Sequence, residues 1–106
     1  MVDGKSRLSC SILAAGIDGH EVTTLEGVQK EAQEFGRFLA AEGAEQCGFC
    51  SPGFVMNVLA MFRELEDPSV DEIKQYLAGN LCRCTGYMGQ LRAIQKYMQS
   101  KKEEQA

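Results

Sequence analysis

The chain has 106 residues, with 11 Lys and Arg against 15 Asp and Glu, which gives a net charge of −4 at pH 7. This length fits one domain with one core, and an acidic chain without a basic stripe argues against a nucleic-acid-binding surface. No apolar run approaches the roughly 20 residues of a membrane span, and the first residues lack a signal-peptide pattern. We therefore expect a cytoplasmic protein, in which the five cysteines are reduced and available to a metal.

The first 25 residues predict little core of their own. Residues 2–5 have the composition of a turn, and residues 7–10 alternate polar and apolar side chains, which is typical of a half-buried strand. Glycines and β-branched residues follow as far as residue 25, which indicates a connecting segment. The single histidine, His20, falls in this segment, and we interpret it as a surface residue.

Residues 26–100 predict a helical domain. Apolar residues recur at three- and four-residue steps over residues 26–42, and Gly43 is placed to end this first helix. A second helix is predicted to begin at Ser51, whose hydroxyl is expected to cap its first turn. Pro52 suits that turn because the N–H that proline lacks is not needed there.

A capping box predicts the third helix, because Ser69 can cap its N-terminus and Glu72 can reach back three residues later. A fourth helix is predicted to begin after Gly86 or Gly89. Residues 101–106 are expected to form a charged, solvated tail. Four helices with short connections predict a compact all-α domain, preceded by a short leftover strand and a linker.

Four of the cysteines form two close pairs. Cys47 and Cys50 make a C-x-x-C pair, and Cys82 and Cys84 make a C-x-C pair, each in a glycine-bearing loop. Because one helical hairpin separates the pairs, the four sulfurs can converge on a single centre. Cysteines can also be buried in a core as small hydrophobic residues, but that role does not explain why these four form two close pairs. A thiol–disulfide catalyst would use Cys47 and Cys50 but leave the other pair unexplained.

A metal centre between the two pairs can be an iron–sulfur cluster or a zinc ion. Each pair precedes a predicted helix N-terminus, whose unpaired N–H groups suit an anionic centre. A [2Fe–2S] cluster with four thiolates carries negative charge and gains more on reduction. Four thiolates also suit structural zinc. However, only one residue separates Cys82 from Cys84, and zinc-binding cysteine pairs usually have two to four residues between them. The spacing alone favours an iron–sulfur cluster but does not exclude a zinc ion.

Two segments carry a resemblance to a known family. Residues 46–53, QCGFCSPG, and residues 79–87, GNLCRCTGY, resemble the iron–sulfur subunit of the molybdenum hydroxylases. That family includes xanthine dehydrogenase, aldehyde oxidoreductase and aerobic carbon monoxide dehydrogenase. Residues 21–27, EVTTLEG, are similar to the segment that joins the two domains of that subunit. The resemblance covers nearly the whole chain and favours iron–sulfur over zinc.

The resemblance implies a four-helix bundle that binds one [2Fe–2S] cluster through Cys47, Cys50, Cys82 and Cys84. It also implies that Gln46 and Cys84 face the pterin of a molybdopterin-binding large subunit. Electrons would pass from the molybdopterin centre through this cluster to a second iron–sulfur cluster, and then to FAD in a flavin-binding subunit. The chain would thus be the electron-transfer component of an oxidoreductase and would catalyse no substrate reaction alone.

The N-terminal part departs from the family pattern. The family has a ferredoxin-like domain with four cysteines, and only the last of them has a counterpart here, Cys10. We therefore expect Cys10 to be a partly buried free thiol, and residues 1–25 to be a remnant of that domain with its linker. Our hypothesis is that Met1 corresponds to an internal methionine of a longer ancestral chain. The alternatives for the function are a structural zinc-binding interaction module and a truncated, inactive remnant.

Overall fold

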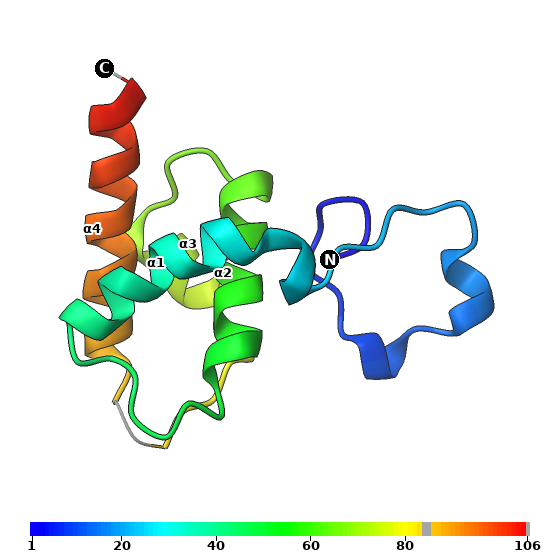
Figure 1. The fold of residues 1–106 in the computed structure, drawn as a ribbon, viewed down its shortest axis with the longest axis horizontal. Helices are drawn as coiled ribbons and strands as arrows, with labels where there is room; N and C mark the ends of the chain where they lie inside the picture. The colour runs from blue at the N-terminus through cyan, green and yellow to red at the C-terminus, as the bar shows by residue number, and fades with distance from the viewer. Residues whose placement is uncertain (84–85, 106) are drawn as a thin grey trace.

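Four α-helices carry the core in the computed structural model, which describes residues 1–83 and 86–105 (Figure 1). The helices are α1 Gln29–Ala41, α2 Ser51–Glu64, α3 Val70–Tyr76 and α4 Met88–Gln105. The β-structure among the described residues consists of isolated bridges that join Val2 to Lys5 and to Val22. The predicted all-α fold is confirmed. Within the same ranges, no helix is long and apolar enough to cross a membrane.

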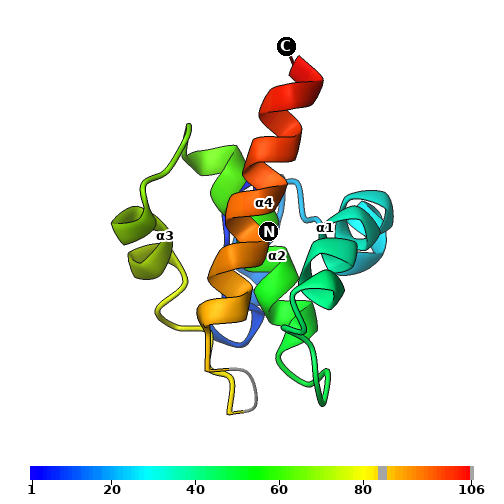
Figure 2. The ribbon, with the colours of Figure 1, turned by 90° about the vertical axis from the view of Figure 1, so that its left-hand side faces the viewer.

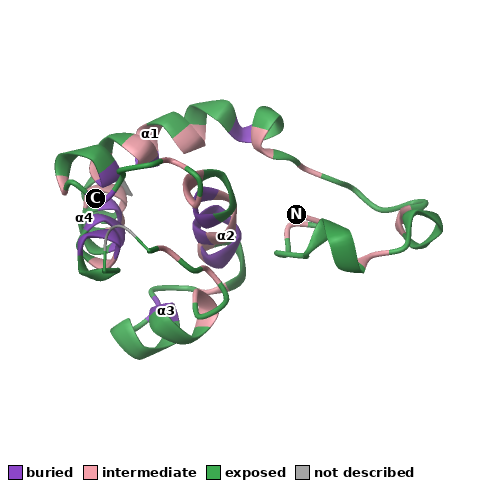
Figure 3. Cartoon of the chain, turned by 90° about the horizontal axis from the view of Figure 1, so that it is seen from below, coloured by how far each residue is buried: buried purple, intermediate pink, exposed green. Residues whose placement is uncertain are grey.

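The helices α2 and α4 form the middle of the molecule. Figures 1 and 2 show that α1 crosses this pair on one side and that α3 covers the opposite side. Figure 3 shows the buried residues on the faces where the helices meet, while the N-terminal segment is largely exposed. The largest fully buried side chains come from α1, α2 and α4; they are Phe35, Val58, Leu59, Met61 and Ile94.

Aromatic rings join α1 and α2 to α4. The ring of Tyr97 meets Phe35 and Phe38 of α1 edge-on, with centroids 5.3 and 5.5 Å apart. The ring of Phe62 from α2 lies 5.4 Å from Tyr97. Edge-to-face contacts at this separation are favourable beyond the area that they bury. This cluster therefore fixes how α4 lies against the other two helices.

The helix boundaries confirm two of the predicted end signals. Gly43 adopts a φ of +64°, and its N–H donates to Ala40 O at 3.0 Å, so it terminates α1 as expected. The capping box is complete, because Glu72 N donates to Ser69 Oγ at 3.3 Å and Ser69 N donates to Glu72 Oε1 at 3.2 Å.

The start of α2 differs from the prediction in one respect. The helix does begin at Ser51, but its N-cap is Cys50, and no side chain caps it. The carbonyl of Cys50 already accepts the N–H of Phe54 at 3.0 Å, so Ser51 is the first helical residue and cannot serve as the cap. The prediction of a Ser51 cap was wrong by one residue.

The N-terminal segment lies outside the helical bundle (Figure 1). Where a strand was expected over residues 7–10, a 3₁₀ turn spans Ser9–Ser11, and Leu8 is 72% exposed. A half-buried strand needs a neighbouring strand and a core to face, and this segment has neither in the described structure. His20 is exposed as predicted, and its Nδ1 lies 2.6 Å from Asp3 Oδ2.

The C-terminal residues also differ from expectation, because α4 continues through residue 105. Lys101 Nζ lies 2.8 Å from Glu34 Oε1 of α1, and Lys102 Nζ lies 2.6 Å from Asp67 Oδ1 of the α2–α3 connection. Residues 101–105, expected to form a solvated tail, therefore extend the last helix. Acidic partners from two other parts of the chain meet the lysines of this turn.

Candidate metal centre

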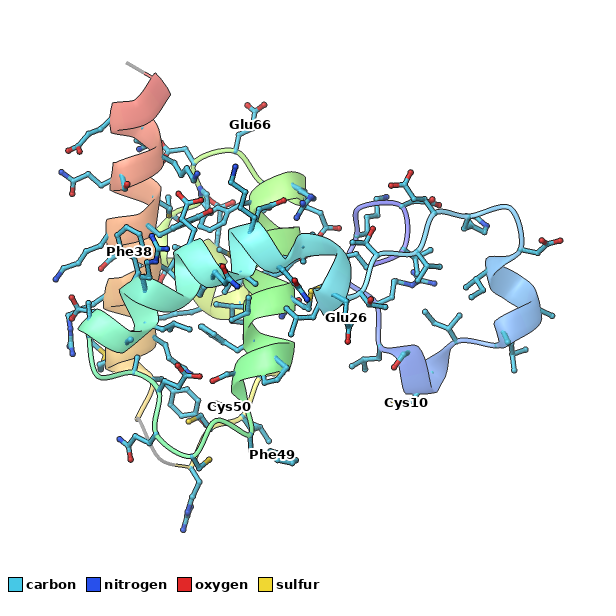
Figure 4. All side chains as sticks on the ribbon, viewed as in Figure 1. Cys10, Glu26, Phe38, Phe49, Cys50 and Glu66 are labelled. Atoms are coloured by element: carbon cyan, nitrogen blue, oxygen red, sulfur yellow. The ribbon has the colours of Figure 1, made fainter. Side chains whose placement is uncertain are left out.

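Two loops meet at the end of the bundle opposite the C-terminus (Figures 1 and 2). One joins α1 to α2 and carries Cys47 and Cys50. The other joins α3 to α4 and carries Cys82. Cys84, the fourth expected ligand, lies outside the described residues. In Figure 4, Cys50 lies at this end of the molecule, while Cys10 lies on the separate N-terminal segment. Cys10 is a free thiol as expected, but it is exposed and not partly buried, because that segment packs few side chains around it.

The described cysteines of the two loops are near enough for Cys47 and Cys82 to affect the pKa of Cys50. Burial of the Cys50 thiol raises its pKa above the usual value, and a hydrogen bond with the thiol of Cys82 raises it further, as do the charges of Cys82 and Cys47. As they stand, no three Cys, His, Asp or Glu side chains of the described residues are close enough to hold a metal ion together. The structure thus pairs Cys50 with Cys82 across the two loops and leaves Cys47 within electrostatic range, without a formed three-ligand site among the described residues.

Backbone conformation shapes the first loop. Gly48, inside the C-x-x-C pair, has a φ of +82°, a left-handed conformation that a residue with a Cβ adopts only with strain. Its carbonyl accepts the N–H of Ser51 at 3.4 Å, which closes a tight turn. Cys50 then directly precedes the first turn of α2. The turn thereby places both cysteines of the pair at the N-terminal end of that helix.

The second loop is braced by Tyr87. Its hydroxyl accepts a hydrogen bond from the backbone N–H of Cys82 at 3.0 Å, so the side chain folds back over its own loop. Tyr87 also has a φ of +74°, which is uncommon for a residue with a bulky side chain. This hydrogen bond keeps the Tyr87 side chain beside the loop that carries Cys82.

Asn57, in the middle of α2, forms hydrogen bonds with the segment that precedes Cys82. Its amide Nδ2 donates to Asn80 Oδ1 at 2.6 Å and to Tyr76 O at 3.4 Å. These contacts hold the end of α3 and the residues just before Cys82 against α2. Sequence reasoning missed Asn57, because its two partners lie 19 and 23 residues further along the chain.

Close packing brings the start of α4 against the first loop. A Cβ on Gly89 would meet Glu42 O and Ala44 Cβ at 3.3 Å, so only glycine allows this approach without a shift of its neighbours. Hydrogen bonds from Lys96 and Arg92 lower the pKa of Glu42, and the Arg92 Nε–Glu42 Oε2 distance is 3.0 Å. The end of α1 is therefore held to α4 next to the cysteine loops.

The helices α2 and α4, with 14 and 18 residues, both begin beside these loops. The first N–H groups of a helix have no intrahelical partner and carry a partial positive charge. Two such ends at one place favour a group with negative charge. This arrangement, together with neighbouring thiols, fits a centre that is anionic and bound by thiolates.

An apolar surface borders the cysteines, and we call it the cysteine-end patch. Its members are the exposed residues Phe49, Leu81, Tyr87 and Met88. Phe49 is 93% exposed and lies at the tip of the molecule beside Cys50 (Figure 4). Gln46, expected to face a pterin, is also exposed, directly before Cys47. Sequence reasoning did not single out Phe49 and Leu81, although large apolar residues in glycine-bearing loops were the available signal.

Comparison with known proteins supplies a family for this chain. The family described as [2Fe–2S] binding domain matches residues 24–95. A probable xanthine dehydrogenase subunit of Bacillus subtilis is 47% identical over 95 residues, which are 88% of this chain and 54% of that protein. A xanthine dehydrogenase iron-sulfur-binding subunit of Escherichia coli O157:H7 is 47% identical over 91 residues, 82% of this chain and 57% of that protein.

Two further similar proteins come from Pseudomonas putida. One of the subunits of its nicotinate dehydrogenase is 33% identical over 105 residues, 97% of this chain and 67% of that protein. The crystal structure of quinoline 2-oxidoreductase has a TM-score of 0.76 and 35% identity, covering 89% of this chain and 59% of that one. The chain thus spans little more than half the length of the two xanthine dehydrogenase subunits.

Proposed function

The chain belongs to the [2Fe–2S] binding domain family, and from that premise we propose that Cys47, Cys50, Cys82 and Cys84 hold one [2Fe–2S] cluster. The observation that carries this proposal is the meeting of two cysteine loops beside the first turns of α2 and α4. Thiolates are the ordinary ligands of such clusters, and positive helix ends offset the negative charge that they bring. The residues present therefore fit the group.

A bound cluster supplies one-electron transfer, and the residues of this chain create the conditions for it. The cysteine thiolates hold the iron, and the bundle keeps the two loops in place as the charge of the centre changes. The N–H groups at the two helix starts favour the extra negative charge of the reduced form. Exposure of Cys47 and of the cysteine-end patch leaves this end of the bundle accessible to a partner.

We further propose that the partner is a molybdopterin-binding large subunit, which meets Gln46, Cys84 and the cysteine-end patch. Electrons would leave the molybdopterin centre there, cross this cluster, and continue to a second iron–sulfur cluster and FAD in a flavin-binding subunit. Support comes from the relatives, which are named as subunits of xanthine and nicotinate dehydrogenases. In this proposal the chain carries electrons for a molybdenum hydroxylase and converts no substrate itself.

Analysis of iron, acid-labile sulfide and zinc on anaerobically purified protein, with its visible spectrum, tests the cluster. We expect about two iron and two sulfide per chain and a reddish absorbance, as a [2Fe–2S] centre gives. About one zinc per chain, without colour, would instead make the chain a structural zinc module, because four thiolates also suit that ion. A chain that keeps neither metal would match a truncated remnant.

The docking surface is tested by replacing Phe49 with aspartate, which puts a charge at the tip of the cysteine-end patch. We expect the dissociation constant for the molybdopterin-binding subunit to rise about tenfold or more, because exposed aromatic residues often anchor interfaces. Isothermal titration calorimetry measures this change. Val70→Asp, on the exposed side of α3, is the control and should leave binding unchanged. Equal binding by Phe49→Asp would place the interface elsewhere.

A further inference from the structure

Gln90 is the only buried polar or charged residue in the described part of the chain, with 5% of its surface exposed. It lies in the first turn of α4, on the same face as the buried Ala93, Ile94 and Tyr97. Burying an amide costs free energy unless the amide finds a hydrogen-bond partner. A glutamine on this face therefore needs a physical explanation.

The partner of the Gln90 amide is a cysteine of the other loop. Its Nε2 donates to Cys50 Sγ at 4.0 Å, across 40 residues of sequence. No buried side-chain nitrogen or oxygen among the described residues lacks a partner. The amide is therefore accommodated by a sulfur that we assign to the cluster.

The Gln90 side chain is buried among mostly apolar neighbours. Gln90 also lines a cavity of about 290 Å³, whose wall is made of the apolar Phe54, Ile73, Leu77, Ala78, Leu91 and Ile94 and the polar Lys74, Asn80 and Tyr87. Burial of Gln90 limits the access of water to its amide, and a hydrogen bond shielded from water is electrostatically stronger. A hydrogen bond to a charged acceptor is also stronger than one to a neutral group. The Gln90–Cys50 contact should therefore respond strongly to the charge on the sulfur.

We propose that Gln90 is a positioning residue for the cluster, which holds Cys50 by an N–H···S hydrogen bond and raises the reduction potential. The inference rests on the proposed function, since it requires a cluster on Cys50. Reduction adds one electron to the centre, the amide keeps both of its protons, and no covalent bond forms or breaks. The added negative charge on the ligand sulfur strengthens the hydrogen bond, so the amide stabilises the reduced form more than the oxidised form.

The test replaces Gln90 with methionine, which has a similar length and can occupy the same buried position but has no N–H. In the full chain, spectroelectrochemical titration should show that the equilibrium constant for reduction falls about tenfold, which is a shift of about 59 mV to lower potential for one electron. The matched control is Gln95→Met, on the exposed side of the same helix, which should leave the potential unchanged. Gln90→Leu provides a second variant without a donor, in case the methionine variant does not fold.

Iron and sulfide are measured on every sample, so that the two proposals can fail separately. A cluster present in wild type and in a folded Gln90 variant, with equal potentials, would overturn the role of Gln90 and leave the proposed function intact. A wild-type chain without a cluster would overturn both. Resonance Raman spectra supply a second readout, because loss of the N–H···S bond should reduce the shift of the Fe–S stretching bands in D₂O. A purely structural glutamine would change thermal stability but neither the potential nor this isotope shift.

Discussion

Replacing Cys50 with alanine is expected to abolish the cluster, with iron and sulfide falling from about two of each per chain to near zero and the visible absorbance lost. Three remaining thiolates leave one iron without its full ligand set. Cys50 also lies where the first loop enters α2, beside Cys82 and Gln90, so no other described cysteine can take its place. Metal analysis and the absorption spectrum of the anaerobically purified variant measure the effect.

Cys10→Ala is the matched control for this experiment. Cys10 is exposed on the N-terminal segment, away from Cys50 (Figure 4). Its replacement should leave iron, sulfide and colour at the wild-type level. Full iron and sulfide in Cys50→Ala, or their loss in Cys10→Ala, would show that the ligand set has been assigned wrongly. The corresponding Cys82→Ala variant should behave like Cys50→Ala.

Replacing Phe35 with alanine is expected to lower the free energy of unfolding by about 3–5 kcal/mol, the usual cost of removing a buried phenylalanine side chain. Phe35 has no exposed surface, and its ring lies 5.3 Å from Tyr97 and 6.2 Å from Phe54. The substitution therefore leaves a cavity where α1, α2 and α4 meet. A loss of this size is a large part of the roughly 5–15 kcal/mol that stabilises a typical domain.

Urea denaturation followed by circular dichroism measures this loss. The matched control is Phe49→Ala, the same substitution at a phenylalanine that is 93% exposed. It should change the free energy of unfolding by less than about 0.5 kcal/mol. Similar effects of the two substitutions would contradict the packing described for α1 against α4. Comparing iron content in the two variants would also show how far cluster retention depends on the bundle.

The sequence alone determined the elements whose signals are local. The apolar spacing of α1, the glycine at position 43 and the box formed by Ser69 and Glu72 all involve residues within one helical turn of each other. Backbone conformation and hydrogen bonds at that range follow from the residues themselves. Residue type and spacing likewise predicted that the two cysteine pairs form a metal-binding set, and this assignment stays a prediction. The family resemblance is confirmed by the match over residues 24–95.

Only the tertiary structure decided which distant residues meet. The contact of Gln90 with Cys50 and that of Asn57 with Asn80 join residues 40 and 23 positions apart, and no local pattern predicts them. The last turn of α4 likewise meets acidic partners from other elements, at Lys101 and Lys102. The prediction of a strand at residues 7–10 was wrong for a related reason. A strand is stabilised by neighbouring strands, and the described structure places none beside these residues. Such contacts depend on how whole helices pack, which the order of residues within one helix does not reveal.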